Sequence, residues 1–312
     1  SQAIHSFFKD RIKKKFYFFD NLKSLNKSNL KKKITNLVIS KSGNTLETVS
    51  IFNIFLKKKD NNIFITQNKK SYLLKLAQKL KAEIVHHNNF IGGRYSVLSE
   101  VGMLPAELMG LDPRKFRQLN NLVKNKRFLN FLVQNTNSIL HFSKKKFNSI
   151  ILNYDHKSDF LFQWYQQLVA ESLGKKGKGI LPIISTMPKD NHSLMQFYLD
   201  GCKNNFFTFF YCKEKNSAKI NNGSLMDEFK YLSSRKIDDI VFKQKIATEK
   251  VFKSKNIPFR SFELKNRDEK NLGEIFCFFI LETILLGRAL NVNPFDQPSV
   301  DLIKKETRKQ FN

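Results

Sequence analysis

Short apolar runs alternate with longer amphipathic stretches along this chain. The runs are rich in β-branched and aromatic residues, as strands buried on both faces are. We expect strands at residues 16–19, 36–40, 62–66, 82–87, 149–153, 179–185, 206–211 and 259–264. The stretches between them predict helices at residues 45–57, 72–81, 114–124, 127–144, 159–174, 192–199, 227–255, 272–290 and from 299 onward. This alternation predicts βαβ units with parallel sheets.

The alternation is interrupted once, by an irregular stretch at residues 88–110 and two helical patterns, and it begins again near residue 149. A chain of 312 residues fits two domains better than one. We expect an α/β fold with two doubly wound parallel sheets in residues 1–125 and 126–292, and a helical tail in residues 293–312. Ligands of such sheets lie beyond the carboxyl ends of the strands, and we expect every site residue there.

The formal charge of +28 suggests nucleic acid at first. The charge is spread along the chain and is mostly lysine, and Asn, Ile and Phe are abundant beside it, so A/T-rich codon usage explains it. We therefore expect no nucleic-acid partner, although the charge draws anionic metabolites toward clefts. The three cysteines form no CxxC pair and favour a reducing, cytoplasmic setting. The most apolar run, residues 275–287, is too short for a membrane span.

A loop between a predicted strand and a predicted helix is crowded with the hydroxyl and amide donors Ser40, Ser42, Asn44 and Thr45. Lys41 adds a positive charge, and Gly43 lets the backbone come close to a ligand. Helix N-termini bind anions, phosphate above all. The spacing of Asn44 and Glu47 resembles a capping box. The alternative is an ordinary helix cap, which does not need so many donors. The pattern therefore favours a phosphate cradle, and it contains neither a Walker nor a dinucleotide glycine motif.

Four segments together carry a family resemblance: ISKSGNTLET (39–48), GGRYSVLSEVGMLP (92–105), QWYQQLVAESLGKKGKGILP (163–182) and NPFDQPSVDLIKKET (293–307). They resemble the glucose-6-phosphate isomerase (phosphoglucose isomerase) family, and they span nearly the whole chain. The resemblance implies two sugar isomerase (SIS) subdomains. It also implies interconversion of glucose 6-phosphate and fructose 6-phosphate through an enediol, as in glycolysis and gluconeogenesis.

The resemblance implies roles for four catalytic residues. Glu171 is expected to be the general base, and Arg94 to stabilise the negative charge of the enediolate. His192 is expected to assist ring opening, and Lys304 to reach the ring-oxygen end of the sugar. The alternatives are a surface carboxylate for Glu171 and a structural ion pair for Arg94. For His192 the alternative is a surface histidine, and for Lys304 it is a solvated basic helix face. The joint presence of these residues favours an enzyme.

The resemblance also implies binding residues and partners. Gly93, Gln167 and Gln297 are expected at the substrate, with Ser40, Lys41, Ser42 and Thr45 at its phosphate. We expect no cofactor. We also expect no metal, since the adjacent residues His86 and His87 point to opposite faces of a strand. The family further implies a homodimer in which His192 serves the neighbouring subunit's site, and no membrane partner.

One family segment is missing from the printed sequence, a glycine-serine loop that follows the opening strand of the first sheet. We therefore expect an N-terminally truncated chain whose first sheet lacks its opening strand, and which has little activity on its own. Two alternatives stay open. One is a non-catalytic SIS module or inactive fragment that binds a sugar phosphate, and the other is a related isomerase that also accepts mannose 6-phosphate.

Overall fold

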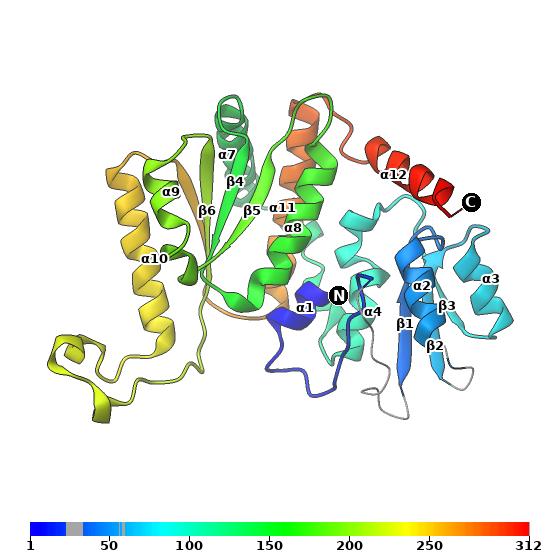
Figure 1. The fold of residues 1–312 in the computed structure, drawn as a ribbon, viewed down its shortest axis with the longest axis horizontal. Coiled ribbons are helices and arrows are strands. Elements are labelled where there is room, and N and C mark those ends of the chain that lie inside the picture. The colour runs from blue at the N-terminus through cyan, green and yellow to red at the C-terminus, as the bar shows by residue number, and fades with distance from the viewer. Residues whose placement is uncertain (23–33, 56, 58–59, 312) are drawn as a thin grey trace. The chain divides into compact units, whose positions relative to one another are not determined.

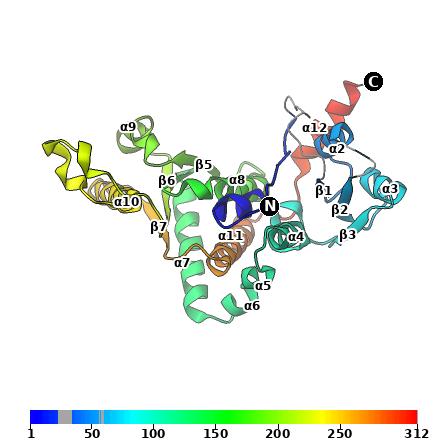
Figure 2. The ribbon, with the colours of Figure 1, turned by 90° about the horizontal axis from the view of Figure 1, so that it is seen from below.

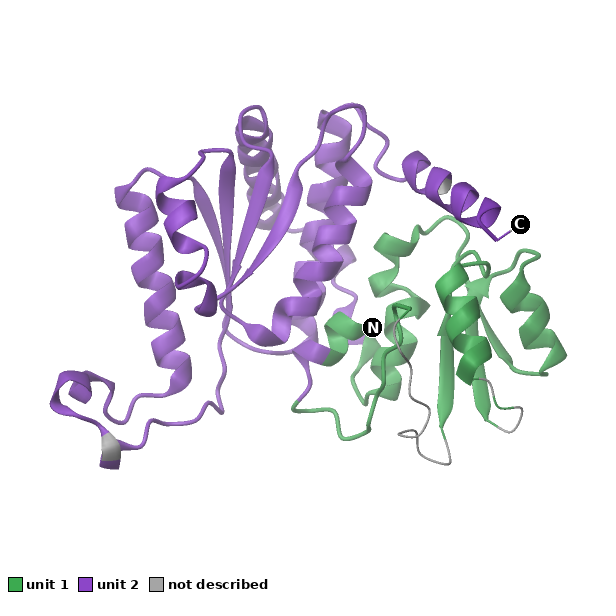
Figure 3. Cartoon of the chain, in the orientation of Figure 1, with its two compact units in different colours: residues 1–5, 10–113 green, residues 6–9, 114–312 purple. Residues whose placement is uncertain are grey.

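The computed structural model describes residues 1–22, 34–55, 57 and 60–311. The chain divides into two compact units, residues 1–5 and 10–113 (unit 1) and residues 6–9 and 114–312 (unit 2) (Figure 3). The predicted SIS subdomain limits, after residues 125 and 292, stay a prediction. Within the described ranges, no helix has the length and apolarity that crossing a membrane requires.

Unit 1 is built on a three-stranded parallel sheet of order β1-β2-β3 (Figure 1). Val38 of β1 pairs with Phe64 of β2, which pairs with Ile84 of β3, and these side chains pack with Phe52 and Leu73 from two helices. The elements are β1 (Thr35–Ile39), α2 (Leu46–Phe55), β2 (Asn61–Gln67), α3 (Tyr72–Lys79), β3 (Glu83–His87), a 3-10 helix (Gly93–Leu98) and α4 (Glu100–Leu108). The predicted parallel α/β fold is confirmed here.

The strand predicted at residues 16–19 is wrong, because this segment has no regular secondary structure. Its aromatic side chains cover other parts of unit 1. The rings of Phe16 and Phe18 lie 5.7 and 5.0 Å from that of His5, and the ring of Phe19 lies 4.6 Å from that of Phe55. The apolar pattern therefore reflects ring contacts with neighbours and not pairing in a sheet, and Tyr17 and Phe19 stay exposed.

Unit 2 is built on a four-stranded parallel sheet of order β5-β4-β6-β7 (Figure 1). The order reverses direction at β4, as expected for a doubly wound sheet. The strands are β4 (Asn148–Asn153), β5 (Leu181–Thr186), β6 (Asn205–Cys212) and β7 (Phe259–Leu264). The helices are α5 (Pro113–Phe116), α6 (Leu119–Leu122), α7 (Lys126–Ser143), α8 (Asp159–Leu173), α9 (Met195–Asp200), α10 (Ile237–Ser254), α11 (Glu269–Ala289) and α12 (Pro298–Lys309), and α1 (Gln2–Phe7) begins the chain.

The inner strand β6 shows why its sequence carries aromatic residues on both faces. Phe207 and Phe209 point to Phe252 of α10, with ring centroids 4.8 and 5.3 Å apart. Phe210 points to the other face, where its ring lies 4.9 Å from that of Phe162 in α8. Helices α9 and α10 lie on one side of this sheet, and α7 and α11 on the other (Figure 2). All eight residues of β6 are buried.

The predicted helix at residues 227–255 is wrong in its first part. Residues Asp227–Leu232 form a 3-10 helix, and α10 begins only at Ile237. Ser234 between them has a φ of 56°, in the left-handed region that a continuing helix excludes. The predicted helix at residues 114–124 is likewise two short helices, α5 and α6.

Candidate active site

The loops that follow β1, β2 and β3 share one edge of the first sheet, because carboxyl ends of parallel strands do so. The predicted phosphate loop directly follows β1. The hydroxyls of Ser40 and Thr45 lie 2.8 Å apart, and the backbone N–H of Asn44 donates to the Ser42 hydroxyl at 3.2 Å. Ser40 is buried, whereas Ser42 and Thr45 are exposed to solvent. The exposed hydroxyls are thus placed to meet a ligand.

Gly43 is required by the close approach of this loop to the start of α3. Its φ is 65°, and a Cβ atom there would lie only 2.2 Å from the hydroxyl oxygen of Ser71. Ser71 in turn caps α3 by accepting from the N–H of Leu74 at 3.3 Å. Any side chain at position 43 would therefore displace the cap of α3 and strain the loop.

The capping box predicted for Asn44 and Glu47 is wrong. The helix α2 begins at Leu46, and the side-chain oxygen of Asn44 accepts instead from the N–H of Tyr72, at 2.9 Å. Asn44 thus ties the loop after β1 to the loop after β2. A sequence pattern cannot show this bond, because its partner is 28 residues away.

Positive charge collects at this edge of the first sheet. Burial lowers the pKa of Lys41, and the neighbouring charges of Lys69 and Arg94 lower it further. Arg94 is 4% exposed, and its guanidinium carbon lies 5.3 Å from the ring centroid of Tyr95. A bound anion would relieve the repulsion between these cations. Lys69 was not predicted from the sequence, because lysine is so common in this chain that one more is not distinctive.

The loop that carries Arg94 is held by a histidine and a carboxylate that sequence reasoning did not single out as supports. His87 is 2% exposed; its Nδ1 contacts Glu100 Oε1, and its Nε2 lies 3.0 Å from the carbonyl oxygen of Ile91. Burial raises the pKa of Glu100, but hydrogen bonds from its own N–H, from His87 and from Asn88 outweigh this and hold the pKa below its usual range. Glu100 thus anchors both ends of this loop as a carboxylate.

Neither Gly93 nor His86 gains a role from its contacts in unit 1. A Cβ atom at Gly93 would meet nothing within 4 Å, so no steric demand of the fold explains the glycine. His86 is exposed, on the face of β3 opposite to His87. Among the described residues, no group of three or more His, Cys, Asp or Glu side chains is arranged to hold a metal ion.

In unit 2, Gln167 and Glu171 share the outward face of α8, as their spacing predicted. The amide of Gln167 donates to Glu171 Oε2 at 3.2 Å. The expected location is wrong, however. Helix α8 runs back from the end of β4, and Glu171 lies two residues before its end at Leu173, which leads to the start of β5 (Figure 1). Glu171 therefore lies at the amino edge of the second sheet and not at the carboxyl edge.

His192 lies at the opposite, carboxyl edge of that sheet, in the turn after β5. Asp190 fixes this turn: its carboxylate accepts from the Ser185 hydroxyl at 2.9 Å, the Thr186 N–H at 2.7 Å and the Ser193 hydroxyl at 3.0 Å. His192 itself is exposed, and α9 begins only at Met195, so the predicted helix start at residue 192 is wrong. One copy of unit 2 thus does not bring Glu171 and His192 together.

Gln297 and Lys304 lie on or next to the last helix. Gln297 is the half-buried residue directly before α12, and Lys304 is exposed on it. A short segment, residues 290–296, connects α11 to Gln297 and is called the linker below. Lys175, just beyond the end of α8, donates to the backbone oxygen of Asp296 at 2.7 Å. Gln297 thus lies near the end of α8, where Glu171 is.

The carboxyl edge of the second sheet is occupied by internal ion pairs. Arg267 donates to both carboxylate oxygens of Asp155, at 3.1 and 2.8 Å, and its guanidinium lies 4.6 Å from the ring centroid of Phe7. Lys157 donates to Glu214 at 2.6 Å. The charges in this cluster pair with one another, so we assign it to the stability of unit 2 and not to ligand binding.

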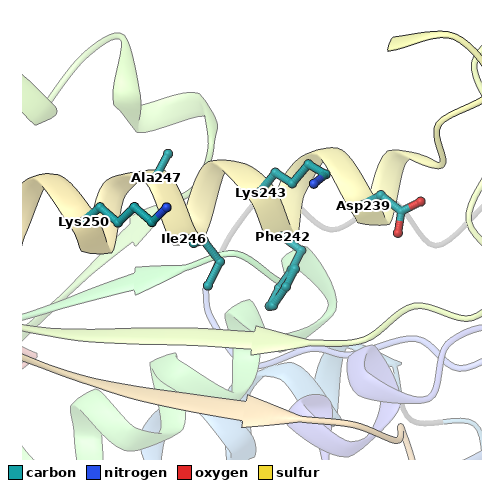
Figure 4. Close-up of a pocket in the computed structure, with 6 residues that line it drawn as sticks. All are labelled: Asp239, Phe242, Lys243, Ile246, Ala247 and Lys250. Atoms are coloured by element: carbon teal, nitrogen blue, oxygen red, sulfur yellow. The ribbon is translucent and has the colours of Figure 1, made fainter. Parts of the chain in front are cut away.

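Two shallow hollows lie in unit 2, and neither contains a predicted site residue. One of about 480 Å³ follows a face of α10 and is lined by Asp239, Phe242, Lys243, Ile246, Ala247 and Lys250 (Figure 4). The other, of about 270 Å³, lies between α7 and the strands β6 and β7, next to Phe131 and Arg260. Neither combines a hydroxyl-rich loop with a cation cluster, as the edge of the first sheet does.

Comparisons with known proteins decide the family. No protein-family model matches the chain. A glucose-6-phosphate isomerase of Methanocaldococcus jannaschii is 31% identical over 310 residues, which cover 93% of this chain and 76% of that relative. The chain belongs to the glucose-6-phosphate isomerase family. The enzyme of that name from Mycoplasmopsis pulmonis is 33% identical over 303 residues, covering 89% of this chain and 69% of that protein.

A solved structure supports the fold of this glucose-6-phosphate isomerase family member. The crystal structure of a glucose-6-phosphate isomerase from Chlamydia trachomatis matches with a TM-score of 0.68 over 89% of this chain and 59% of the other, at 16% identity. The family resemblance found in the sequence is therefore confirmed, and so is the α/β fold with parallel sheets.

Proposed function

We propose that the protein interconverts glucose 6-phosphate and fructose 6-phosphate. The observation that carries this proposal is membership of the glucose-6-phosphate isomerase family over 93% of the chain. The hydroxyl-rich loop with Lys41, Lys69 and Arg94 supports a sugar phosphate as the substrate. A module that only bound sugar phosphates would need this loop but not Glu171 and His192, so we do not favour that alternative.

We propose that the phosphate is held at the carboxyl edge of the first sheet. Its oxygens accept hydrogen bonds from the hydroxyls of Ser42 and Thr45 and from backbone N–H groups at the start of α2, beside Lys41. Gly93 leaves room for the sugar next to Arg94, since the space beside its Cα is open. Gln167 and Gln297 orient the hydroxyls of the chain form of the sugar.

The proposed chemistry moves one proton from C2 to C1 and one from O2 to O1 of the sugar. The Glu171 carboxylate takes the proton from C2 of open-chain glucose 6-phosphate, the electron pair forms the C1–C2 double bond, and the C1 carbonyl oxygen becomes an enediolate oxygen near Arg94. Glu171 then returns the proton to C1 while the hydroxyl proton of O2 passes to O1, which leaves the C2 carbonyl and the C1 hydroxyl of fructose 6-phosphate. His192 and Lys304 serve the preceding ring opening. No external oxidant or reductant is consumed, so the proposal includes no cofactor.

The two hydroxyls of the loop are expected to bind the phosphate. Ser42→Ala and Thr45→Ala each weaken binding of substrate and of inorganic phosphate, because a hydrogen bond to a charged group contributes about 1.5–3 kcal/mol. The measurement is the inhibition constant of inorganic phosphate, which rises about 10- to 100-fold in either variant. Thr48→Ala, one turn further along α2, is the matched control and leaves that constant unchanged. Equal constants for Thr45→Ala and Thr48→Ala would contradict the cradle.

We also propose a homodimer that shares its active sites. It is supported by the location of Glu171 and His192 at opposite edges of one sheet, so that a second copy has to supply His192. Mixing inactive Glu171→Gln with inactive His192→Asn protein, after reversible dissociation, is expected to restore about a quarter of wild-type activity, since half of the dimers are mixed and each has one intact site. Mixtures that stay inactive would contradict the shared site.

Location and substrate range complete the proposal. All three cysteines are free thiols, which supports a reducing compartment such as the cytoplasm. A coupled assay with fructose 6-phosphate tests the activity, and glucose 6-phosphate is the expected product. The same assay with mannose 6-phosphate decides whether the third sugar is accepted. The assay uses the protein extended upstream to include the expected glycine-serine loop, and such a protein that converts none of the three sugars would contradict the proposed function.

A further inference from the structure

The loop between α8 and β5 is a tight turn that carries three lysines, Lys175, Lys176 and Lys178. Lys176 and Gly177 both have positive φ, 55° and 69°, as in the tightest two-residue hairpin turns, and Lys175 and Lys178 pair across it. Gly179 brings the chain back against the end of α8, where a Cβ atom would lie 2.7 Å from the carbonyl oxygen of Leu173. The turn thus fixes Lys175 close to the end of the helix that carries Glu171.

Lys175 contacts the linker at three acceptors. Its Nζ contacts the carbonyl oxygen of Asn293, and it lies 2.7 Å from the backbone oxygen of Asp296 and 2.7 Å from the Oδ1 atom of the same residue. An ammonium group has three N–H donors, so the linker satisfies all of them. The Lys175 side chain is only 11% exposed, although it belongs to the residue type that is most often solvated.

The linker is fixed at its beginning without Lys175. Val292 donates to the carbonyl oxygen of Gly287 at 2.9 Å, and the ring of Pro294 packs so closely on Gly287 that a Cβ atom there would lie 2.9 Å from it. Beyond Pro294, the contacts of Lys175 fall on Asp296, the residue directly before Gln297. The last residues before Gln297 and α12 are therefore the part of the linker that Lys175 holds.

We propose that Lys175 is a positioning residue of the sugar-phosphate site, which holds Gln297 and Lys304 at a fixed place relative to Glu171. This inference rests on the proposed function. Lys175 itself does not touch the substrate in this proposal. It ties the end of α8 to the start of α12, so that the base on one helix and the substrate-binding groups on the other keep one geometry.

The test replaces Lys175 by methionine, which keeps the length of the side chain but removes its donors and charge. We expect kcat/KM to fall about 30- to 100-fold, since misplacing substrate-binding groups by about 1 Å has effects of that size. Lys178→Met is the matched control: the ammonium of Lys178 holds the carbonyl oxygen of Leu290, at the already fixed end of α11. This control is expected to stay within about threefold of wild type.

A merely structural role is separated by a double-mutant cycle and by hydrogen exchange. If Lys175 acts through Gln297 and Lys304, Lys175→Met costs less than about threefold when Gln297 is already alanine and Lys304 is already methionine. Amide hydrogens of residues 297–304 also exchange faster in Lys175→Met than in Lys178→Met. Additive losses, or equal exchange in the two variants, would overturn the positioning role while leaving the isomerase intact. A wild-type protein that includes the expected glycine-serine loop and has no turnover would overturn the proposed function, and with it this role.

Discussion

Replacing Glu171 with glutamine is expected to lower kcat about 10³- to 10⁴-fold and to leave KM within about threefold of wild type. Glutamine has nearly the shape of glutamate and still accepts from the amide of Gln167, so sugar-phosphate binding persists. It does not accept a proton from C2, so the loss falls on the chemical step. Steady-state kinetics in the direction of glucose 6-phosphate measures both constants.

Glu274→Gln is the control for this change. Glu274 is a partly exposed carboxylate of α11, 4.0 Å from the ammonium of Lys270, and it has no place in the proposed mechanism. Its replacement is expected to leave kcat and KM as they are. A Glu171→Gln enzyme with near-normal kcat would remove Glu171 from the role of the base, even if every other assignment held.

Replacing Arg94 with methionine is expected to lower kcat about 10²- to 10³-fold, as the loss of one group that stabilises a developing oxyanion does. The side chain is buried beside Tyr95 in the loop anchored by Glu100, so its position is set before substrate arrives. The cation then meets a charge that is largest in the enediolate, and its removal affects turnover more than binding.

Lys69→Met separates this effect from simple attraction of the phosphate. Lys69 adds positive charge to the same edge but follows β2 and has no proposed contact with the reacting carbons. Its loss is expected to raise KM by less than about tenfold, with kcat unchanged, and more strongly at low ionic strength. If Arg94→Met raised only KM and kept kcat, Arg94 would be a binding residue and not the stabiliser of the enediolate.

Most strands and helices were predictable because the spacing of apolar residues along the sequence differs between the two. The run at residues 206–211 is aromatic at every position except Thr208, and β6 is indeed buried on both faces. The same signal misled at residues 16–19, where the rings pack on His5 and Phe55 without a paired strand. Apolar composition alone does not define a strand, because a strand also needs a neighbouring strand with which it can pair.

The residues proposed for the candidate site came from the sequence, but their arrangement in space did not. The hydroxyl-rich loop lies where a strand meets a helix, as expected. The location of Glu171 at the opposite edge of its sheet from His192 was not expected. A sequence gives the order of the elements, but it does not show at which edge of the sheet a residue near the end of a helix will lie. Lys175 and Glu100 were missed for a related reason, since their roles come from bonds to distant residues, 121 positions away for the Lys175–Asp296 pair.

The most direct test is to run the reaction from fructose 6-phosphate in deuterium oxide and to follow the products by proton NMR. The proposed mechanism predicts that glucose 6-phosphate accumulates and that part of it carries deuterium at C2. The deuterium enters because the proton taken by Glu171 exchanges with solvent before it is returned. Fructose 6-phosphate that remains unchanged would contradict the isomerase assignment, and glucose 6-phosphate with no deuterium at C2 would contradict the exchangeable base.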